Sequence, residues 1–341
     1  MTPLRYLTPF FFLALFALGE WLGGGWTFLA AGATPLCVAG LDVALGKDKA
    51  GSSGAPIARW LPRVYIVLQL AANSVAAALV ARPTTTLLEM IGLTLSAGVT
   101  TGVFGFLAAH EMIHSPRPRE RALGLALLGS VFYMHFRIAH VYGHHRRAAT
   151  AEDPATARLG EGLYAFLVRT IVGQFEEAWT FEARRRRRTG HPVFGLGNRM
   201  VGYVAIEALF LLMVALISLR ALVFLVVVAA IAVALLEAFN YVAHYGLRRR
   251  ILPDGRPERL TPGHSWNSAR RMNNAALFNM GRHSHHHLAM TQSYEGLQPL
   301  SGDARLPSGY AAALLTALIP PLWKSLMDPR ARAIGESERS A

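Results

Sequence analysis

The chain contains 341 residues, of which 52% are hydrophobic and only 16% are charged, and its 34 Lys and Arg against 21 Asp and Glu give a formal net charge of +13. Soluble globular chains usually carry about 25% charged residues. The composition therefore excludes a disordered chain, argues against an ordinary soluble enzyme and favours a protein with several membrane spans. Because Cys37 is the one cysteine, a disulfide framework, an all-cysteine iron–sulfur cluster and a four-cysteine zinc or iron site are excluded within this chain.

Six apolar runs approach the length of about 20 residues that a helix needs to cross a bilayer. They cover residues 7–22, 26–45, 64–80, 86–109, 200–219 and 221–241. A shorter apolar stretch, residues 122–136, contains His135 and is followed by Arg137, so we interpret it as a re-entrant or interfacial helix. Five runs follow the first one, and Glu20 and Trp21 occupy the place of a cleavage site, so we expect the first run to be retained.

Loop charges predict the orientation of these spans. Lysines and arginines are concentrated after the second, fourth and sixth runs, including the continuous arginine run at 184–188, whereas Arg82 and Arg220 are the clear basic residues of the opposite loops. The positive-inside rule then places both termini and both large loops in the cytoplasm. Basic loops beside spans attract anionic headgroups, and no nucleic-acid-binding module is visible, so we expect no nucleic-acid partner.

The predicted fold class is all-α: a polytopic membrane protein with about six transmembrane helices and a cytoplasmic helical cap that holds a histidine-rich di-metal site. We expect one integrated domain with five parts. These are four N-terminal spans (1–109), a cytoplasmic segment with two histidine clusters (110–199), two further spans (200–243), a cytoplasmic cap with the remaining histidines (244–328) and a flexible polar tail (329–341).

Histidine is the unusual residue, with 13 copies that are mostly clustered. His110 and His114 follow the fourth run at i,i+4 spacing, which places both rings on one helix face, and together with Glu111 they also fit the His-Glu-x-x-His pattern of zinc proteases. A second cluster consists of His140, His144 and His145, and a third consists of His283, His286 and His287. A single histidine, His244, lies at the end of the sixth run.

Nine neutral nitrogen donors at one membrane face predict two metal ions. Imidazole suits Fe, Zn, Cu and Ni, and one zinc ion takes four ligands, so a single hydrolytic zinc would leave most of the donors idle. A two-zinc hydrolase usually includes carboxylate ligands, and only Glu111, Glu152 and Asp153 are close in sequence. The redox alternative is a pair of irons that activates O2 beside the lipid. A histidine-rich metal transporter is a further alternative, but transport sites lie near the bilayer midplane.

The motifs around these histidines resemble those of a known family. In chain order they read His110-Glu-Met-Ile-His114, His140-Val-Tyr-Gly-His144-His145, Asn240-Tyr-Val-Ala-His244-Tyr-Gly246 and Arg282-His283-Ser-His-His286-His287. The chain resembles the integral-membrane di-iron alkane 1-monooxygenases, relatives of the membrane fatty-acid desaturases and of xylene-type methyl hydroxylases. The resemblance covers about the whole chain, and desaturases lack the His-Tyr-Gly element.

The resemblance implies an enzyme of a bacterial-type inner (plasma) membrane that inserts oxygen from O2 into the terminal methyl group of an alkane-like substrate. Two electrons per turnover would come from a separate rubredoxin-type carrier and its reductase. Two Fe ions would be held by His110, His114, His140, His144, His145, His244, His283, His286 and His287. Within the same enzyme class, a methyl hydroxylase of an alkylaromatic or terpene, or a lipid desaturase, is the alternative.

Three positions depart from the pattern of that family, because Ala139, Ala243 and His285 stand where it usually has acids. Acids beside ligand histidines orient the rings and raise their basicity. Three residues are candidates for hydrogen-bonding a ligand ring here, each with an alternative. Glu111 could instead be an ordinary helix residue, Asp153 could cap the turn before Pro154, and His285 could be an exposed side chain. Candidates for an apolar tunnel on the fourth run are Phe104, Phe106 and Leu107.

Overall fold

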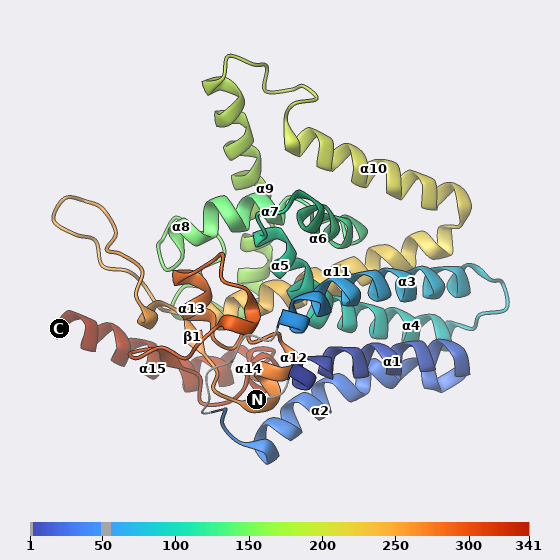
Figure 1. Ribbon diagram of the computed structural model, residues 1–341, viewed down its shortest axis with the longest axis horizontal. Coiled ribbons are helices and arrows are strands. Elements are labelled where there is room, and N and C mark those ends of the chain that lie inside the picture. Colours follow the sequence, from blue (N-terminus) through green and yellow to red (C-terminus); the bar gives the residue numbers. More distant parts are fainter. Residues whose placement is uncertain (1–2, 49–55, 341) are drawn as a thin grey trace.

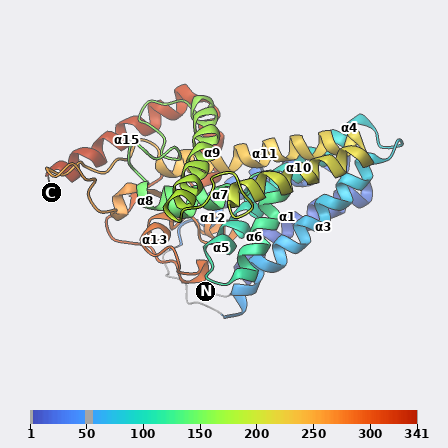
Figure 2. The same ribbon diagram turned by 90° about the horizontal axis from the view of Figure 1, so that it is seen from above.

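The computed structural model describes residues 3–48 and 56–340. Within these residues, five helices are long and apolar enough to cross a membrane: Gly24–Leu45, Ala58–Ala81, Leu87–His114, Arg199–Ile217 and Leu219–His244. The predicted fold class, an all-helical polytopic membrane protein, is confirmed. The spans run side by side away from a cap of short helices and loops (Figures 1 and 2).

The first predicted span differs from expectation. Residues 7–22 form α1 (Thr8–Leu22), which has 15 residues and is about 22 Å long at 1.5 Å per residue, too short to cross a bilayer by itself. It follows the 3-10 helix η1 (Pro3–Leu7) and ends at Gly23, which has a positive φ of 67°. Helix α1 packs against α2 (Leu29–Leu45), α3 (Leu61–Ala81) and α4 (Leu87–Thr100), so it belongs to the bundle.

The long span Leu87–His114 carries the first histidine pair into the cap. It begins with a capping box in which Thr86 and Glu89 exchange side-chain and backbone hydrogen bonds, continues through the π-helix η4 (Thr101–Gly105) and ends as α5 (Phe106–His114). Gly102 lies against Ala232 of α11 (Leu219–His244), where a Cβ would come within 2.8 Å of the Ala232 Cα. This close approach keeps α4 and α11 side by side, so that both helices deliver histidines to the same place.

Most elements of the cap are short, with the 26-residue α9 as the exception. The 3-10 helix η2 (Gly24–Phe28) begins the span Gly24–Leu45 at the end of the bundle away from the cap, where it packs against α1 and α4, and η3 (Pro56–Trp60) precedes α3. The elements between the fourth span and α10 (Arg199–Ile217) are α6 (Pro118–Ser130), α7 (Phe136–Ile138), the π-helix η5 (Ala139–His144), α8 (His145–Arg147) and α9 (Leu163–Arg188).

After α11 the chain forms η6 (Pro262–His264), β1 (Trp266–Asn267), α12 (Arg271–Ala276), α13 (His283–Leu288), η7 (Tyr294–Gly296), β2 (Ala304–Arg305), α14 (Tyr310–Ala317) and α15 (Pro320–Ser340). Strands β1 and β2 pair in parallel, with Trp266 opposite Ala304. Helix α15 continues past position 329, where the polar tail was expected, and contains Pro329.

An ion-pair network fixes α13 to the N-terminal part of the chain. The buried carboxylate of Asp48 lies 3.0 Å from the guanidinium groups of both Arg5 and Arg282, and Arg282 directly precedes α13. The carboxylate compensates part of the charge of the two guanidinium groups in a place with little water, where an unpaired charge would be costly. The network therefore sets the position of the helix that carries the last three predicted ligands.

Candidate metal centre

The structure brings all nine predicted ligand histidines together in two adjacent groups. In each group, the possible ligand atoms lie within 4.8 Å of one another. The five-imidazole group consists of His110, His114, His140, His145 and His286, and the four-imidazole group consists of His144, His244, His283 and His287. The groups draw on α5, η5, α8, α11 and α13, so neither exists until the spans and the cap have assembled.

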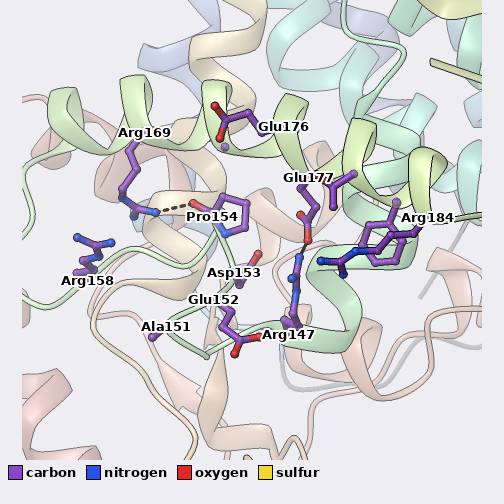
Figure 3. Close-up of a pocket in the computed structure, with 13 residues that line it drawn as sticks. Arg147, Ala151, Glu152, Asp153, Pro154, Arg158, Arg169, Glu176, Glu177 and Arg184 are labelled. Atoms are coloured by element: carbon purple, nitrogen blue, oxygen red, sulfur yellow. Dashed lines mark hydrogen bonds and ion pairs between the residues drawn. The ribbon is translucent and has the colours of Figure 1, made fainter. Parts of the chain in front are cut away.

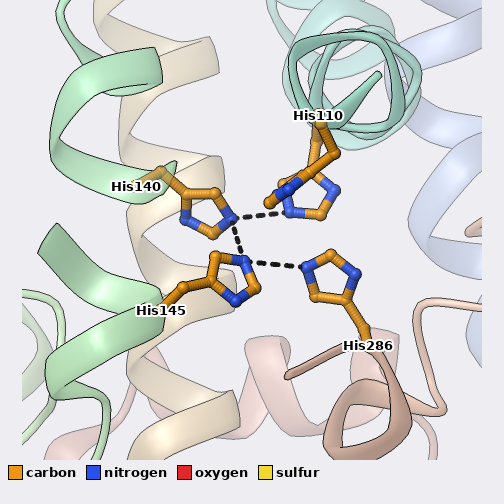
Figure 4. A group of neighbouring side chains, drawn as sticks. His110, His140, His145 and His286 are labelled. Atoms are coloured by element: carbon orange, nitrogen blue, oxygen red, sulfur yellow. Dashed lines mark hydrogen bonds between the residues drawn. The ribbon is translucent and has the colours of Figure 1, made fainter. Parts of the chain in front are cut away.

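In the five-imidazole group, the rings point toward a shared centre (Figure 4). The Nε2 atom of His140 lies 2.8 Å from that of His110 and 3.1 Å from that of His145, which in turn lies 3.1 Å from the Nε2 atom of His286. The Nε2 atom of His114 is buried and has no hydrogen-bond partner among the described residues. One atom type from each ring thus converges on the same small volume.

All members of the four-imidazole group are buried. The Nε2 atoms of His244, His283 and His287 form a triangle with sides of 3.0, 3.1 and 3.2 Å. A ring nitrogen offers either one N–H or one lone pair in the ring plane, so three nitrogens that face one another cannot all be satisfied by hydrogen bonds. A cation at their centre would satisfy all three lone pairs.

Burial keeps the imidazoles of the cap in the neutral form that binds metals. It lowers the pKa of His140, His145, His283, His286 and His287 well below the usual value near 6.5, and the neighbouring imidazoles lower it further. Neutral imidazole nitrogens suit divalent transition metals. The residues present therefore fit two such ions, one in each group.

The second cluster is divided at the π-helix η5. Helical i,i+4 spacing predicts that His140 and His144 share a face, but the structure places them in different groups and joins His140 with His145. The π-helix η5 (Ala139–His144), whose backbone hydrogen bonds run from i to i+5, lies at this point of the chain. The rings of His140 and His144 do lie together, with stacked centroids 5.2 Å apart, but they contribute to different groups.

Asp153 contacts a predicted ligand directly. Its Oδ2 atom accepts a hydrogen bond from Nδ1 of His144 at 2.8 Å and one from the Thr156 hydroxyl at 2.6 Å, while Oδ1 accepts from the backbone N–H of Ala155. Burial raises the pKa of this carboxyl, but the hydrogen bonds that it accepts from His144 and Thr156 outweigh this effect, and the net pKa of Asp153 is lowered. Asp153 thus caps the turn and also orients the His144 ring, leaving Nε2 for a metal.

The loop of Asp153 is held in place from outside by charged side chains (Figure 3). There Arg169 donates a hydrogen bond to the backbone carbonyl of Pro154 at 3.0 Å, and Arg147 pairs with Glu177. The same Arg169 forms an ion pair with Glu161 at 2.8 Å. Helix α9 therefore fixes the loop that aims Asp153 at His144.

The other two candidate acids or bases lie elsewhere. Glu111 accepts a hydrogen bond from the backbone N–H of Tyr294 at 3.3 Å and lines a polar cavity of about 330 Å³ that also touches His114. His285 is partly exposed, belongs to neither group, and its Nδ1 accepts the backbone N–H of Gln298 at 2.7 Å. Both contacts are with the backbone and not with a ligand ring.

The two alanine departures leave ring nitrogens without an acid. Ala139 and Ala243 are fully buried, and the Nδ1 atoms of the following histidines, His140 and His244, have no hydrogen-bond partner among the described residues. The Nδ1 atoms of His110, His145 and His287 also lack a hydrogen-bond partner among the described residues, whereas the Nδ1 atom of His144 contacts Asp153.

Sequence reasoning did not single out Glu237. This buried carboxylate of α11 accepts hydrogen bonds from the hydroxyls of Tyr133 and Thr170, at 3.0 and 3.1 Å, and from the Asn240 amide at 3.1 Å. It joins α11 to α9 two helical turns before His244 and so helps to position that ring. A single acid inside an otherwise apolar run is the signal that could have revealed it.

Comparison with known proteins agrees with this geometry. The sequence pattern of the family described as fatty acid desaturase matches residues 85–312. Alkane 1-monooxygenase 2 of Pseudomonas aeruginosa is 41% identical over 71% of this chain and 65% of its own length. The alkane 1-monooxygenase of Acinetobacter baylyi is 36% identical over 85% of this chain and 73% of its own length.

A third relative, the xylene/toluene monooxygenase hydroxylase component of Pseudomonas putida, is 30% identical over 96% of this chain and 88% of its own length. The chain spans 65% of the length of each of the two Pseudomonas aeruginosa alkane 1-monooxygenases that it matches. With its family pattern over residues 85–312 and its relatives at 30–41% identity, the chain belongs to the fatty acid desaturase family and is similar to the alkane 1-monooxygenases within it.

Proposed function

We propose that this protein is a membrane monooxygenase with two non-haem Fe ions, which hydroxylates the terminal methyl group of an alkane or a similar apolar molecule. The observation that carries the proposal is the convergence of nine imidazoles into two adjacent groups at the ends of membrane spans. The names of the relatives support alkanes as the substrate class. The electrons would come from a rubredoxin-type carrier and its reductase on the cytoplasmic side of an inner membrane.

The nine histidines would hold the two irons, one in each group, and the irons would supply the reduction of O2 and the removal of hydrogen from an unactivated C–H bond. The residues of this chain orient the ligand rings and exclude water from them. Asp153 fixes the tautomer of His144 by accepting its Nδ1 proton. Phe136 stacks on His140 with ring centroids 4.7 Å apart, which restrains that ring and keeps water away from it.

An apolar cavity of about 250 Å³ supports an apolar substrate. Its wall comes from α2, α4, η4, α5, α11 and α14, and it includes Leu107 and Phe239. Leu107 lies one helical turn before His110, and the Phe239 ring lies 5.7 Å from the ring of His283. The cavity therefore reaches toward both groups from the membrane-spanning part of the bundle, where a hydrocarbon dissolves. Of the three predicted tunnel residues, Leu107 lines this cavity, whereas Phe104 and Phe106 do not.

The xylene/toluene relative, which aligns over nearly the whole chain, makes the methyl group of an alkylaromatic the second candidate. The cavity is apolar and has no charged lining residue, so it would accept either kind of molecule. The discriminating quantity is the relative rate with linear and aromatic substrates.

The test is metal analysis coupled to product detection. The purified protein in nanodiscs should contain about two irons per chain, and with O2, a rubredoxin, its reductase and octane it should form a primary alcohol. His144→Ala should abolish turnover, because it leaves the four-imidazole group with three donors, and His191→Ala, at an exposed histidine, is the matched control. One zinc per chain without O2 consumption would reject the proposal, and an alkene product would assign a desaturase.

A further inference from the structure

A concave, strongly basic surface lies where α10 begins. We call it the arginine basin; it has a volume of about 620 Å³ and is lined by Tyr142, Arg146, Phe181, Glu182, Arg184, Arg185, Arg188, Thr189 and Arg199. Five arginines and one carboxylate give this lining a formal charge of +4. It lies at the end of a membrane span, since Arg199 is the first residue of the span Arg199–Ile217.

Internal ion pairs use only part of this charge. The buried Glu182 is 2.9 Å from Arg185 and 2.5 Å from Arg199, and the Arg199 guanidinium lies 5.2 Å from the centre of the Tyr142 ring. These contacts fix the side chains of Glu182, Arg185 and Arg199 in the wall of the arginine basin. The side chains of Arg146, Arg184 and Arg188 are exposed and form no ion pair with another described residue.

An apolar groove begins one helical turn after Arg199 on the same face of α10. This groove, which we call the α10 groove, has a volume of about 940 Å³ and lies between α3, α6, α10 and α11. The α10 residues on its wall include Tyr203, Ile206, Phe210, Met213 and Ile217. Counted from Arg199, they follow at intervals of three or four residues, which places them on the same face of the helix as that arginine.

We infer that the arginine basin and the α10 groove form one binding site for an anionic phospholipid. The headgroup phosphate would contact Arg146, Arg184 and Arg188, and one acyl chain would lie in the α10 groove. Arginine matches phosphate oxygens with two parallel hydrogen bonds, and basic pockets between transmembrane helices bind anionic headgroups.

A lipid explains both halves of the site. A free phosphate ion would use the basin and leave the apolar groove without a role. An acidic electron carrier would meet a charged surface, but a concave basin at the membrane boundary, with an apolar groove one helical turn further along the membrane span, offers it no matching shape. Along one face of α10, basic residues are followed by an apolar wall. This order matches a phospholipid, whose charged headgroup is followed by apolar acyl chains.

The test uses detergent-purified full-length protein and native mass spectrometry with palmitoyl-oleoyl phosphatidylglycerol and phosphatidylcholine. Each arginine near an anionic headgroup contributes to the binding free energy of the lipid. The triple variant Arg146→Gln/Arg184→Gln/Arg188→Gln should therefore weaken phosphatidylglycerol binding about 100-fold. The control is Arg119→Gln/Arg187→Gln/Arg259→Gln, which removes the same charge from exposed positions outside the basin and should leave binding unchanged. Because Arg146 adjoins a predicted ligand, Arg184→Gln/Arg188→Gln alone should still lower the affinity about 30-fold.

The apolar half is tested separately. Ala126→Leu fills the α10 groove and should release the lipid, whereas Ala205→Leu, on the exposed side of α10, should not. Equal loss in both arginine triples would show general surface charge and overturn the inference. So would inorganic phosphate that competes as well as the lipid, or a basin variant that keeps the lipid and loses an acidic rubredoxin. None of these readouts depends on hydroxylation, so failure here leaves the proposed function untouched.

Discussion

The two imidazole groups differ in number, burial and support. The five-imidazole group has one donor more than a tetrahedral set, and two of its members, His114 and His145, are partly exposed. A polar cavity of about 330 Å³ reaches it at His114. The four-imidazole group is fully buried, and its His144 is held by Asp153.

This difference indicates unequal tolerance to change. A group with five donors retains four after one is lost, whereas a group with four donors falls to three. A buried group supported by a carboxylate holds its ion through geometry and basicity, and a group beside a polar cavity can exchange water or ligands. The two ions of the proposed pair should therefore respond differently to the same kind of mutation.

The largest effect is expected from comparing His287→Ala with His114→Ala. Removing His287 leaves three imidazoles in the four-imidazole group, so the variant should purify with about one iron per chain. Removing His114 leaves four in the other group, which equals the number that a tetrahedral site needs, and about two irons should remain. The measurement is iron content by mass spectrometry of the purified proteins.

His285→Ala is the matched control for both variants, because His285 is a neighbouring cap histidine that belongs to neither group. It should keep about two irons. If His114→Ala loses as much iron as His287→Ala, the fifth imidazole is not a spare donor, and the proposed difference between the groups is wrong.

A smaller effect is expected from Asp153→Asn. The amide can still accept the Nδ1 proton of His144 but carries no charge, so the ring becomes a weaker donor. Loss of such a partner typically costs 10–100-fold in metal affinity. A competition titration with an iron chelator should show this loss for one ion of the two, with the other unchanged.

Glu152→Gln provides the control for Asp153→Asn, since Glu152 is exposed and adjacent in sequence. It should titrate like the unmodified protein. Equal weakening of both ions in Asp153→Asn would mean that the residue supports the loop as a whole and has no specific influence on His144.

The sequence predicted the bundle better than the cap. Apolar runs of sufficient length, each with at most one charged residue, identified five of the spans, because burial in lipid requires little more than length and composition. The run at 7–22 looked like a sixth, but the break at Gly23 limits α1 to 15 residues. The pairing of β1 with β2 joins positions 266 and 304, and no local pattern predicts a contact between two-residue strands so far apart.

For the site, the sequence predicted which histidines converge but not how they divide. The i,i+4 pair His110 and His114 falls into one group as α-helical spacing indicates, and so do His283 and His287. The division of His140 from His144 falls at a π-helical turn, which has no recognisable sequence signal here. Whether Asp153 caps a turn or orients a ring depended on the three-dimensional path of its loop, and it does both.

The smallest expected effect concerns pH, and it tests whether the two groups are equally dry. Burial lowers the folded-state pKa of His145 and of His287 below the unfolded value near 6.5, so the unfolded chain binds more protons between those values. Stability of the metal-free protein is then full above about pH 6.5 and falls by about 1.4 kcal/mol per pH unit for each such histidine below it. His287→Gln and His145→Gln should each remove one proton from the number taken up on unfolding, so the melting temperature should fall less steeply between pH 7 and 5. His191→Gln, at an exposed position, should leave this slope unchanged. If only His287→Gln flattens it, water reaches His145 through the cavity at His114, and the five-imidazole group is the wetter of the two.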